Sequence, residues 1–135
     1  MANVEYYGEY DPELNLVFTK FINKPKTSED VDVFINGNKE WFAKGGNNRV
    51  WNITDISNMG IASVSVVTEY QKKAEPLIDK YLVDYCVVCT NPLEKLTVNL
   101  FNILMGKRRP IFKTKEEAIK WVLKEQETRG RFIPL

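Results

Sequence analysis

The sequence contains no histidine, and this absence removes several kinds of active site. Histidine is the commonest general base and the commonest metal ligand in enzymes. A Ser-His-Asp or Cys-His centre is therefore excluded. With only two cysteines, a zinc site would depend largely on carboxylates. We predict that the protein is not an enzyme and has no catalytic residues, no metal site and no cofactor.

Long apolar runs are also missing, since none reaches the roughly 18 residues that would span a bilayer. The first residues, Met-Ala-Asn-Val-Glu-Tyr-Tyr, lack the basic and apolar regions of a secretory signal, so we expect a cytoplasmic protein. Residues 1–68 hold 6 Lys/Arg and 9 Asp/Glu, and residues 69–135 hold 13 and 9. This asymmetry is mild beside the strongly basic surfaces that bind nucleic acid, so no nucleic-acid partner is expected.

The two cysteines form a Cys86-Val-Val-Cys89 motif inside a predicted strand. A redox motif of this spacing places its first cysteine at the start of a helix. Residues three apart in a strand are roughly 10 Å apart and point to opposite faces, which is too far for a disulfide. We therefore interpret the cysteines as two buried, small apolar residues.

What the chain does contain is typical of one globular domain: 135 residues, of which 44% are apolar and 27% charged. Apolar and β-branched runs predict strands at Val4–Tyr10, Leu14–Phe21, Arg49–Ile56, Val83–Thr90 and Arg109–Lys113. Helical spacing predicts helices from a cap at Thr27 or Ser28 to Gly45-Gly46, through Val66–Tyr81, and at Leu93–Met105 and Lys115–Glu127. The order β-β-α-β-α-β-α-β-α predicts a single α/β domain over residues 1–135, with a five-stranded mixed sheet and about four helices. Its core covers about residues 4–127, and the tail 128–135 has no strong pattern.

Three residues carry more detailed predictions about the helices. Gly37 should weaken the middle of the first helix. Pro76 should kink the second helix or split it in two. Asn91 should cap the third helix, with Pro92 at its first position.

The segment Leu93–Met105 has more apolar residues than one buried stripe requires. The surplus makes Leu96, Leu100, Phe101 and Leu104 candidates for binding a partner or a ligand. A second subunit, a protein partner, a lipid-like ligand and a membrane surface each fit this pattern. The alternative is a helix packed deeply between its neighbours.

Two polar groups are further candidates. Lys107, Arg108 and Arg109 could bind an anion or an acidic partner, or could be a solvated turn that complements the preceding helix end. Asp55 and Ser57 follow the carboxyl end of a strand, where ligands bind in open α/β sheets. Their alternative role is that of turn and cap residues, and the loop is not a phosphate-binding P-loop because it has one glycine and no Lys-Ser/Thr.

The chain resembles the STAS-type fold of sulfate-transporter and anti-sigma-factor-antagonist domains, and specifically its SpoIIAA-like, STAS/SEC14-like branch of short stand-alone proteins. The resemblance covers roughly Val4 to Lys124. It is carried by Tyr10-Asp11-Pro12-Glu13, Asn99-Leu100-Phe101 with Gly106, Arg109-Pro110-Ile111-Phe112, and Glu116-Glu117-Ala118-Ile119-Lys120-Trp121. It implies a five-stranded mixed sheet with helices mainly on one face, and a non-enzymatic, bacterial regulatory module that interacts with proteins or senses ligands.

In anti-sigma-factor antagonists, the resemblance further implies a phosphorylated switch serine at the start of the second helix. Asp55-Ile56-Ser57 looks like the start of that run. Counting onward, Ser63 falls at the second aspartate, Val64 at the switch serine and Ser65 at the serine after it. Valine cannot be phosphorylated, so Ser63 or Ser65 would have to substitute.

The leading functional prediction is a non-enzymatic STAS-like regulatory or interaction module. It would bind a protein partner or small ligand through the loop Asp55–Ser65 and the helix Leu93–Met105. The alternative is a carrier or sensor of a lipid-like, apolar small molecule. A remote alternative is a histidine-free hydrolase that uses Ser57 and Asp55. A homodimer and peripheral contact with a membrane both remain open.

Overall fold

The elements follow the predicted order, with one short strand added at the end of the chain. The computed structural model describes residues 2–135. The strands are β1 (Glu5–Asp11), β2 (Leu16–Ile22), β3 (Asn48–Asn58), β4 (Leu82–Val88), β5 (Ile111–Phe112) and β6 (Ile133–Pro134). The helices are α1 (Ser28–Phe42), α2 (Val64–Tyr81), α3 (Lys95–Met105) and α4 (Lys115–Arg129), with a short 3₁₀ turn η1 (Ala43–Gly45) after α1.

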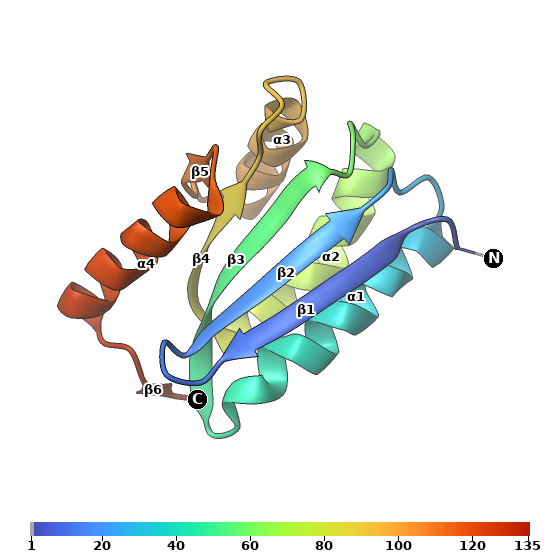
Figure 1. Cartoon of the computed structure of the whole chain (residues 1–135). Helices are drawn as coiled ribbons and strands as arrows, with labels where there is room; N and C mark the ends of the chain where they lie inside the picture. Colours follow the sequence, from blue (N-terminus) through green and yellow to red (C-terminus); the bar gives the residue numbers. More distant parts are fainter. Residues whose placement is uncertain (1) are drawn as a thin grey trace.

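The strands form one mixed sheet, as predicted, and lie in it in the order β1-β2-β3-β4-β5 (Figure 1). The opening hairpin pairs β1 and β2 antiparallel. The following pairs, β2–β3, β3–β4 and β4–β5, are all parallel. The short β6 pairs antiparallel with the first residues of β3.

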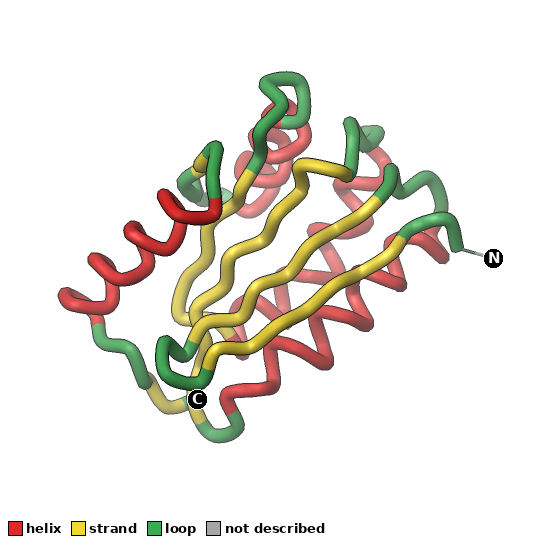
Figure 2. The backbone as a smooth tube through the Cα atoms, in the orientation of Figure 1, coloured by secondary structure: helices red, strands yellow, loops and turns green. Residues whose placement is uncertain are grey.

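Three helices cover one face of the sheet, and α4 covers part of the other (Figure 2). Parallel strands joined through a helix follow right-handed crossovers. Because α1, α2 and α3 each connect one parallel strand to its next neighbour in the same direction, all three fall on the same face. The last helix follows the last strand of this series and packs behind β3 and β4 through Ala118 and Val122.

The central strand β3 is buried on both faces. Strands of this kind carry apolar residues on both sides. Trp51 and Ile53 lie in the cluster that α4 covers. The Trp51 ring contacts the edge of Trp121 on α4, with ring centroids 6.4 Å apart. Val50 and Ile56 lie on the opposite face, beneath α1 and α2.

Helix α1 and strand β1 approach closely through two glycine–aromatic contacts. The Trp41 indole lies over Gly8, and the Tyr6 ring lies against Gly37. A β-carbon at either glycine would overlap the facing ring. Gly37 therefore has a packing role, which explains a residue that is otherwise unfavourable inside a helix.

One helix prediction was wrong in detail, and one was right only in part. Pro76 lies inside α2, and of its two predicted effects, a kink or a split, the split does not occur because the helix is continuous. Asn91 does not cap α3: its Oδ1 accepts from the Leu93 backbone N–H at 2.9 Å and closes a separate turn. That turn leads through Glu94 into α3, which begins at Lys95, so Pro92 lies outside the helix.

All the predicted strands differ from the observed ones by a residue or more, and three differences matter most. β5 has only two residues, because the neighbouring Arg109 and Lys113 do not pair in the sheet. β3 extends to Asn58 and includes both Asp55 and Ser57, which were expected at or beyond its end. The tail forms β6, a pairing that its weak sequence pattern gave no reason to expect. Among the described residues, no helix combines the length and apolar character needed to cross a membrane.

We predict that Gly37→Ala lowers the free energy of unfolding by about 1–3 kcal/mol, because the new methyl group overlaps the Tyr6 ring. The effect is opposite in sign to the helix propensity of alanine, which exceeds that of glycine by about 1 kcal/mol. Urea unfolding measures the change. Asn36→Ala, at the exposed neighbouring position of α1, is the matched control and should be neutral or slightly stabilising. If Gly37→Ala is stabilising as well, the close packing described here is wrong.

Candidate functional site

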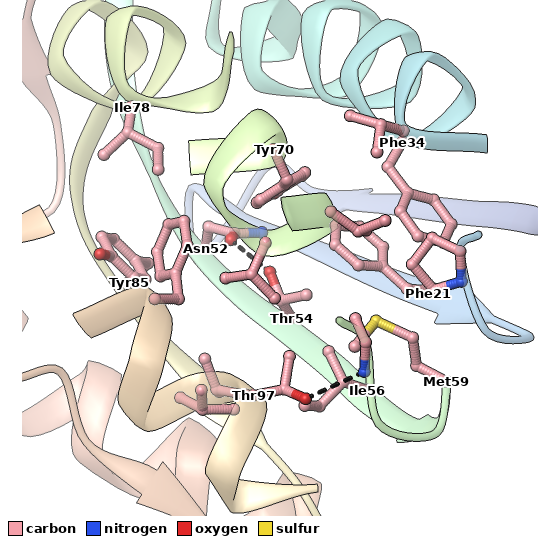
Figure 3. A pocket seen from close by; sticks show the side chains of 18 of the residues that line it. Phe21, Phe34, Asn52, Thr54, Ile56, Met59, Tyr70, Ile78, Tyr85 and Thr97 are labelled. Atoms are coloured by element: carbon pink, nitrogen blue, oxygen red, sulfur yellow. Dashed lines mark hydrogen bonds between the residues drawn. The ribbon is translucent and has the colours of Figure 1, made fainter. Parts of the chain in front are cut away.

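An apolar cavity lies between the sheet and the three helices on its crowded face (Figure 3). Its volume is about 90 Å³. Strands β2, β3 and β4 form its floor, α1 and α2 its roof, and α3 one wall. Among the described residues that line it, none carries a charge.

The cavity follows from the sizes of the side chains that meet on this face. Thr54 and Val87 of the floor are small, whereas large rings line the cavity from β2 and β4 as well as from the helices. Phe21 and Phe34 stack with centroids 4.2 Å apart, and the Phe21 ring meets the edge of Tyr70 at 5.7 Å. Rings fixed against one another cannot collapse onto a floor of small residues, so space remains between them.

The polar groups on the cavity floor satisfy one another. Asn52 Nδ2 donates to the Val17 carbonyl at 3.0 Å and to Thr19 Oγ1 at 3.3 Å. Asn52 Oδ1 accepts from Thr54 Oγ1 at 2.8 Å, and the hydroxyls of Thr19 and Thr54 lie 2.9 Å apart. The floor therefore presents no free charge and little unused hydrogen-bonding capacity to a ligand.

The tyrosines around the cavity are held as neutral phenols. Tyr70 OH accepts from Asn38 Nδ2 at 2.9 Å, and Asn38 Oδ1 accepts from Tyr6 OH at 2.9 Å. Burial raises the pKa of both Tyr70 and Tyr6. Burial also raises the pKa of Tyr85 to about 12. The Tyr85 hydroxyl is buried and has no hydrogen-bond partner among the described residues.

The candidate residues of the apolar helix divide between two sides of α3. Phe101 lines the cavity and packs against Tyr70, with ring centroids 5.6 Å apart. Leu100 and Leu104 are half-buried against the core. Leu96 is 60% exposed and points away from the core. One helix therefore presents apolar groups both to the interior and to solvent.

Two further wall residues of α3, Thr97 and Val98, were not among the candidates from the sequence. The Thr97 hydroxyl accepts from the Ala62 backbone N–H at 3.2 Å and ties α3 to the segment before α2. Val98 is buried and lines the cavity. They follow Leu96 by one and two positions. Because each residue turns the helix by about 100°, a helical wheel with Leu96 facing solvent places Val98 on the buried side and Thr97 at its border.

The polar candidates from the sequence lie around α2 and the end of β3. Asp55 Oδ1 accepts from the Ser57 backbone N–H at 2.8 Å, which is a turn interaction, and the Ser57 hydroxyl has no partner among the described residues. Ser63 caps α2 by accepting from the Val66 backbone N–H at 3.3 Å, and its Oγ lies 3.2 Å from that of Ser65. Val64 is the first residue of α2 and is 66% exposed.

Of the three basic residues Lys107, Arg108 and Arg109, only Arg109 forms an ion pair within the described part of the chain. Arg109 donates to the buried carboxylate of Asp84, which also accepts from Arg129 at 2.6 Å. Lys107 and Arg108 are exposed and have no ion pair among the described residues. Arg109 is thus a structural anchor, and any anion site would depend on Lys107 and Arg108.

The two thiols are free and buried, and they lie on opposite faces of the sheet. Cys86 belongs to the cluster beneath α4, and Cys89 to the cluster on the cavity side. Burial raises the pKa of Cys86 to about 12 and also raises the pKa of Cys89. Both thiols are therefore protonated near neutral pH, which is the opposite of a reactive redox pair.

Known proteins resemble this chain in fold and not in sequence. No family model and no curated protein match the chain. An anti-sigma factor antagonist from Mycobacterium paratuberculosis superposes with a TM-score of 0.65 at 11% identity, over 90% of this chain and 95% of that one. A DUF3478-family protein from Shewanella loihica PV-4 gives 0.63 at 15% identity, with the same coverage. The chain has the SpoIIAA-like fold.

The same SpoIIAA-like fold also occurs inside a much larger protein. SLC26A9 superposes with a TM-score of 0.61 at 10% identity, over 97% of this chain but only 26% of that chain. At these identities the likeness establishes the fold alone. It confirms the fold class and the resemblance that the sequence motifs indicated.

Glu94 is a buried carboxylate in the turn before α3, and one of its oxygens has no partner among the described residues. Burial raises its pKa, with a further contribution from Asp55, although the Gly60 backbone N–H acts in the opposite direction. The folded protein therefore holds this proton more tightly than the unfolded chain does. The contribution of Glu94 to stability falls as the pH rises from about 4.5 through the raised pKa, and is constant above it.

We predict that Glu94→Gln raises the free energy of unfolding near neutral pH, because it removes a buried charge and keeps the shape of the side chain. The gain over the wild type should be small below about pH 4.5 and should grow as the pH rises. Urea unfolding of both proteins across this range gives the difference at each pH. A difference that does not change with pH would contradict the assignment.

Proposed function

We propose that the protein is a non-enzymatic module of the SpoIIAA-like fold that binds an uncharged, apolar small molecule in the cavity between its sheet and α1–α3. The observation that carries this proposal is the absence of any charged residue among the described residues that line the cavity. A buried charge without a partner is strongly unfavourable. The cavity therefore suits an apolar molecule, or the apolar part of a larger one.

The size of the cavity restricts what can enter without rearrangement. A volume of about 90 Å³ is smaller than the roughly 150 Å³ of an engineered apolar cavity that takes up benzene or xenon. A single small apolar group fits the space as it stands. A longer chain requires the surrounding side chains, such as Phe101 and Val98, to move apart.

A regulatory protein partner is the second candidate, and the exposure of Val64 at the first position of α2 favours it. An anti-sigma factor antagonist is among the proteins that share the fold. Val64 and Ile61 are exposed beside Ala62, which is hydrogen-bonded to α3. An interaction surface could therefore combine this loop with α3, as the sequence predicted, in a cytoplasmic protein.

The histidine-free hydrolase has less support. A serine nucleophile needs a base within hydrogen-bonding distance. The Ser57 hydroxyl has no such partner among the described residues, and the Asp55 carboxylate bonds to backbone instead. The proposal therefore assigns no reaction to this pair.

We predict that Val98→Phe abolishes uptake of small apolar molecules, because its ring occupies the cavity. The measurement is methyl NMR of the protein under xenon pressure, with the wild type expected to show saturable shifts at Val66, Val87 and Val98. Affinity should fall at least about tenfold, or about 1.4 kcal/mol. Leu96→Phe adds the same ring on the exposed side of α3 and should leave uptake unchanged.

Native mass spectrometry of the purified wild type then tests for a larger ligand retained from the cell. A wild type that binds no xenon would overturn the proposal. So would undiminished uptake by a folded Val98→Phe variant. In either case the protein partner becomes the leading candidate.

A further inference from the structure

An exposed apolar face lies on the outer side of α3 and the segments next to it. Leu96 and Ile103 are 60% and 75% exposed. They are seven residues apart, about two helical turns, so they lie on the same side of the helix, with the exposed Asn99 between them. Leu93, in the turn before α3, is 59% exposed. We call these three residues the outer face of α3.

Two more exposed apolar residues lie at the neighbouring end of α2. Val64 and Ile61 are among the exposed large apolar side chains. The hydrogen bond from the Ala62 backbone N–H to Thr97 holds their segment against α3. Figure 1 shows α3 and the first turn of α2 at the same end of the molecule. Five of the eight exposed large apolar residues that the described chain contains therefore lie in these two adjoining regions.

Positive charge borders the outer face of α3. Lys95 opens the helix, and Lys107 and Arg108 follow its end. Gly106, with φ +68°, ends the helix in the left-handed conformation, and the Arg109–Asp84 ion pair fixes the chain just beyond. The two basic residues between these fixed points are exposed. From Lys95 to Lys115 the sequence has no acidic residue.

We propose that the outer face of α3 docks on an anionic lipid membrane, with Leu93, Leu96 and Ile103 in the interface and the bordering basic residues on the headgroups. An amphipathic helix with a projecting apolar side and flanking Lys/Arg residues has the composition of helices that lie in the membrane interface. Anionic headgroups attract such basic clusters. The proposal is independent of whether the cavity is occupied.

Charge favours a membrane over a second copy of the chain. A twofold dimer would bring the same face of each copy together. Two outer faces in contact would then bring together the Lys95, Lys107 and Arg108 side chains of both copies, with no acidic residue of α3 between them to compensate. Anionic lipid removes this repulsion and accepts the apolar side chains.

The test is flotation of the full chain with vesicles of phosphatidylcholine mixed with phosphatidylglycerol, and with vesicles of phosphatidylcholine alone. The wild type should float with the mixed vesicles, and binding should weaken as salt is added, because the charges are screened. Leu96→Ser/Ile103→Ser should lower the affinity for the mixed vesicles at least about tenfold. Lys107→Glu/Arg108→Glu should remove the preference for the anionic vesicles.

The matched control is Tyr7→Ser/Phe132→Ser, which removes two apolar side chains that are each 54% exposed elsewhere. This control should float like the wild type. Circular dichroism checks that each variant is folded. Failure of the wild type to float overturns the proposal, as does equal flotation of Leu96→Ser/Ile103→Ser. A dimeric mass in solution that becomes monomeric in that variant would assign the face to a second copy instead.

Discussion

After the opening hairpin, each new strand of the sheet is added beside the previous one in the same direction, and the rest of the structure depends on this constraint. Right-handed crossovers between parallel neighbours require α1, α2 and α3 to share one face. Three helices and the large rings they carry must then fit over the narrow floor made by β2, β3 and β4. The cavity is the space that this arrangement leaves. Helix α4, outside the series, packs on the other face, where a hollow of about 230 Å³ beside its first residue, Lys115, has charged residues in its lining, unlike the cavity.

The crowded face also explains where polar groups and glycines appear in the core. Asn52 and Thr54 stand where large apolar residues would fill the cavity, and their hydrogen bonds with each other and with Thr19 offset the loss of water. Gly8 and Gly37 allow α1 to approach the edge strand closely enough to close the roof. These residues keep the space open while the elements around it stay firmly packed.

The sequence was sufficient to predict the order of elements and the α/β class, because apolar spacing and helix caps are local signals, and the resemblance in its motifs indicated the SpoIIAA-like fold. It was less reliable where a second local signal competed: Asn91 closes a turn of its own through Leu93 and does not start α3. The pairing of Ile133 with Arg49 could not be predicted, since it depends on where the end of α4 places the tail relative to β3. The cavity could not be predicted from the sequence either. It results from residues as distant as Phe21 and Phe101 meeting around one space, and no local pattern records the volume between them.

The three tryptophans are distributed unevenly with respect to the cavity. Trp51 and Trp121 are in contact behind the sheet, and the Arg129 guanidinium lies 5.2 Å from the Trp51 ring centre. Trp41 lies on the other face, over Gly8, and none of the three lines the cavity. The tryptophan fluorescence of the protein therefore reports the packing of α4 on the sheet and of α1 on β1. It does not respond to direct contact with a molecule in the cavity. Such contact falls on Phe and Tyr rings, so its optical signature belongs to the tyrosine region of the near-ultraviolet spectrum.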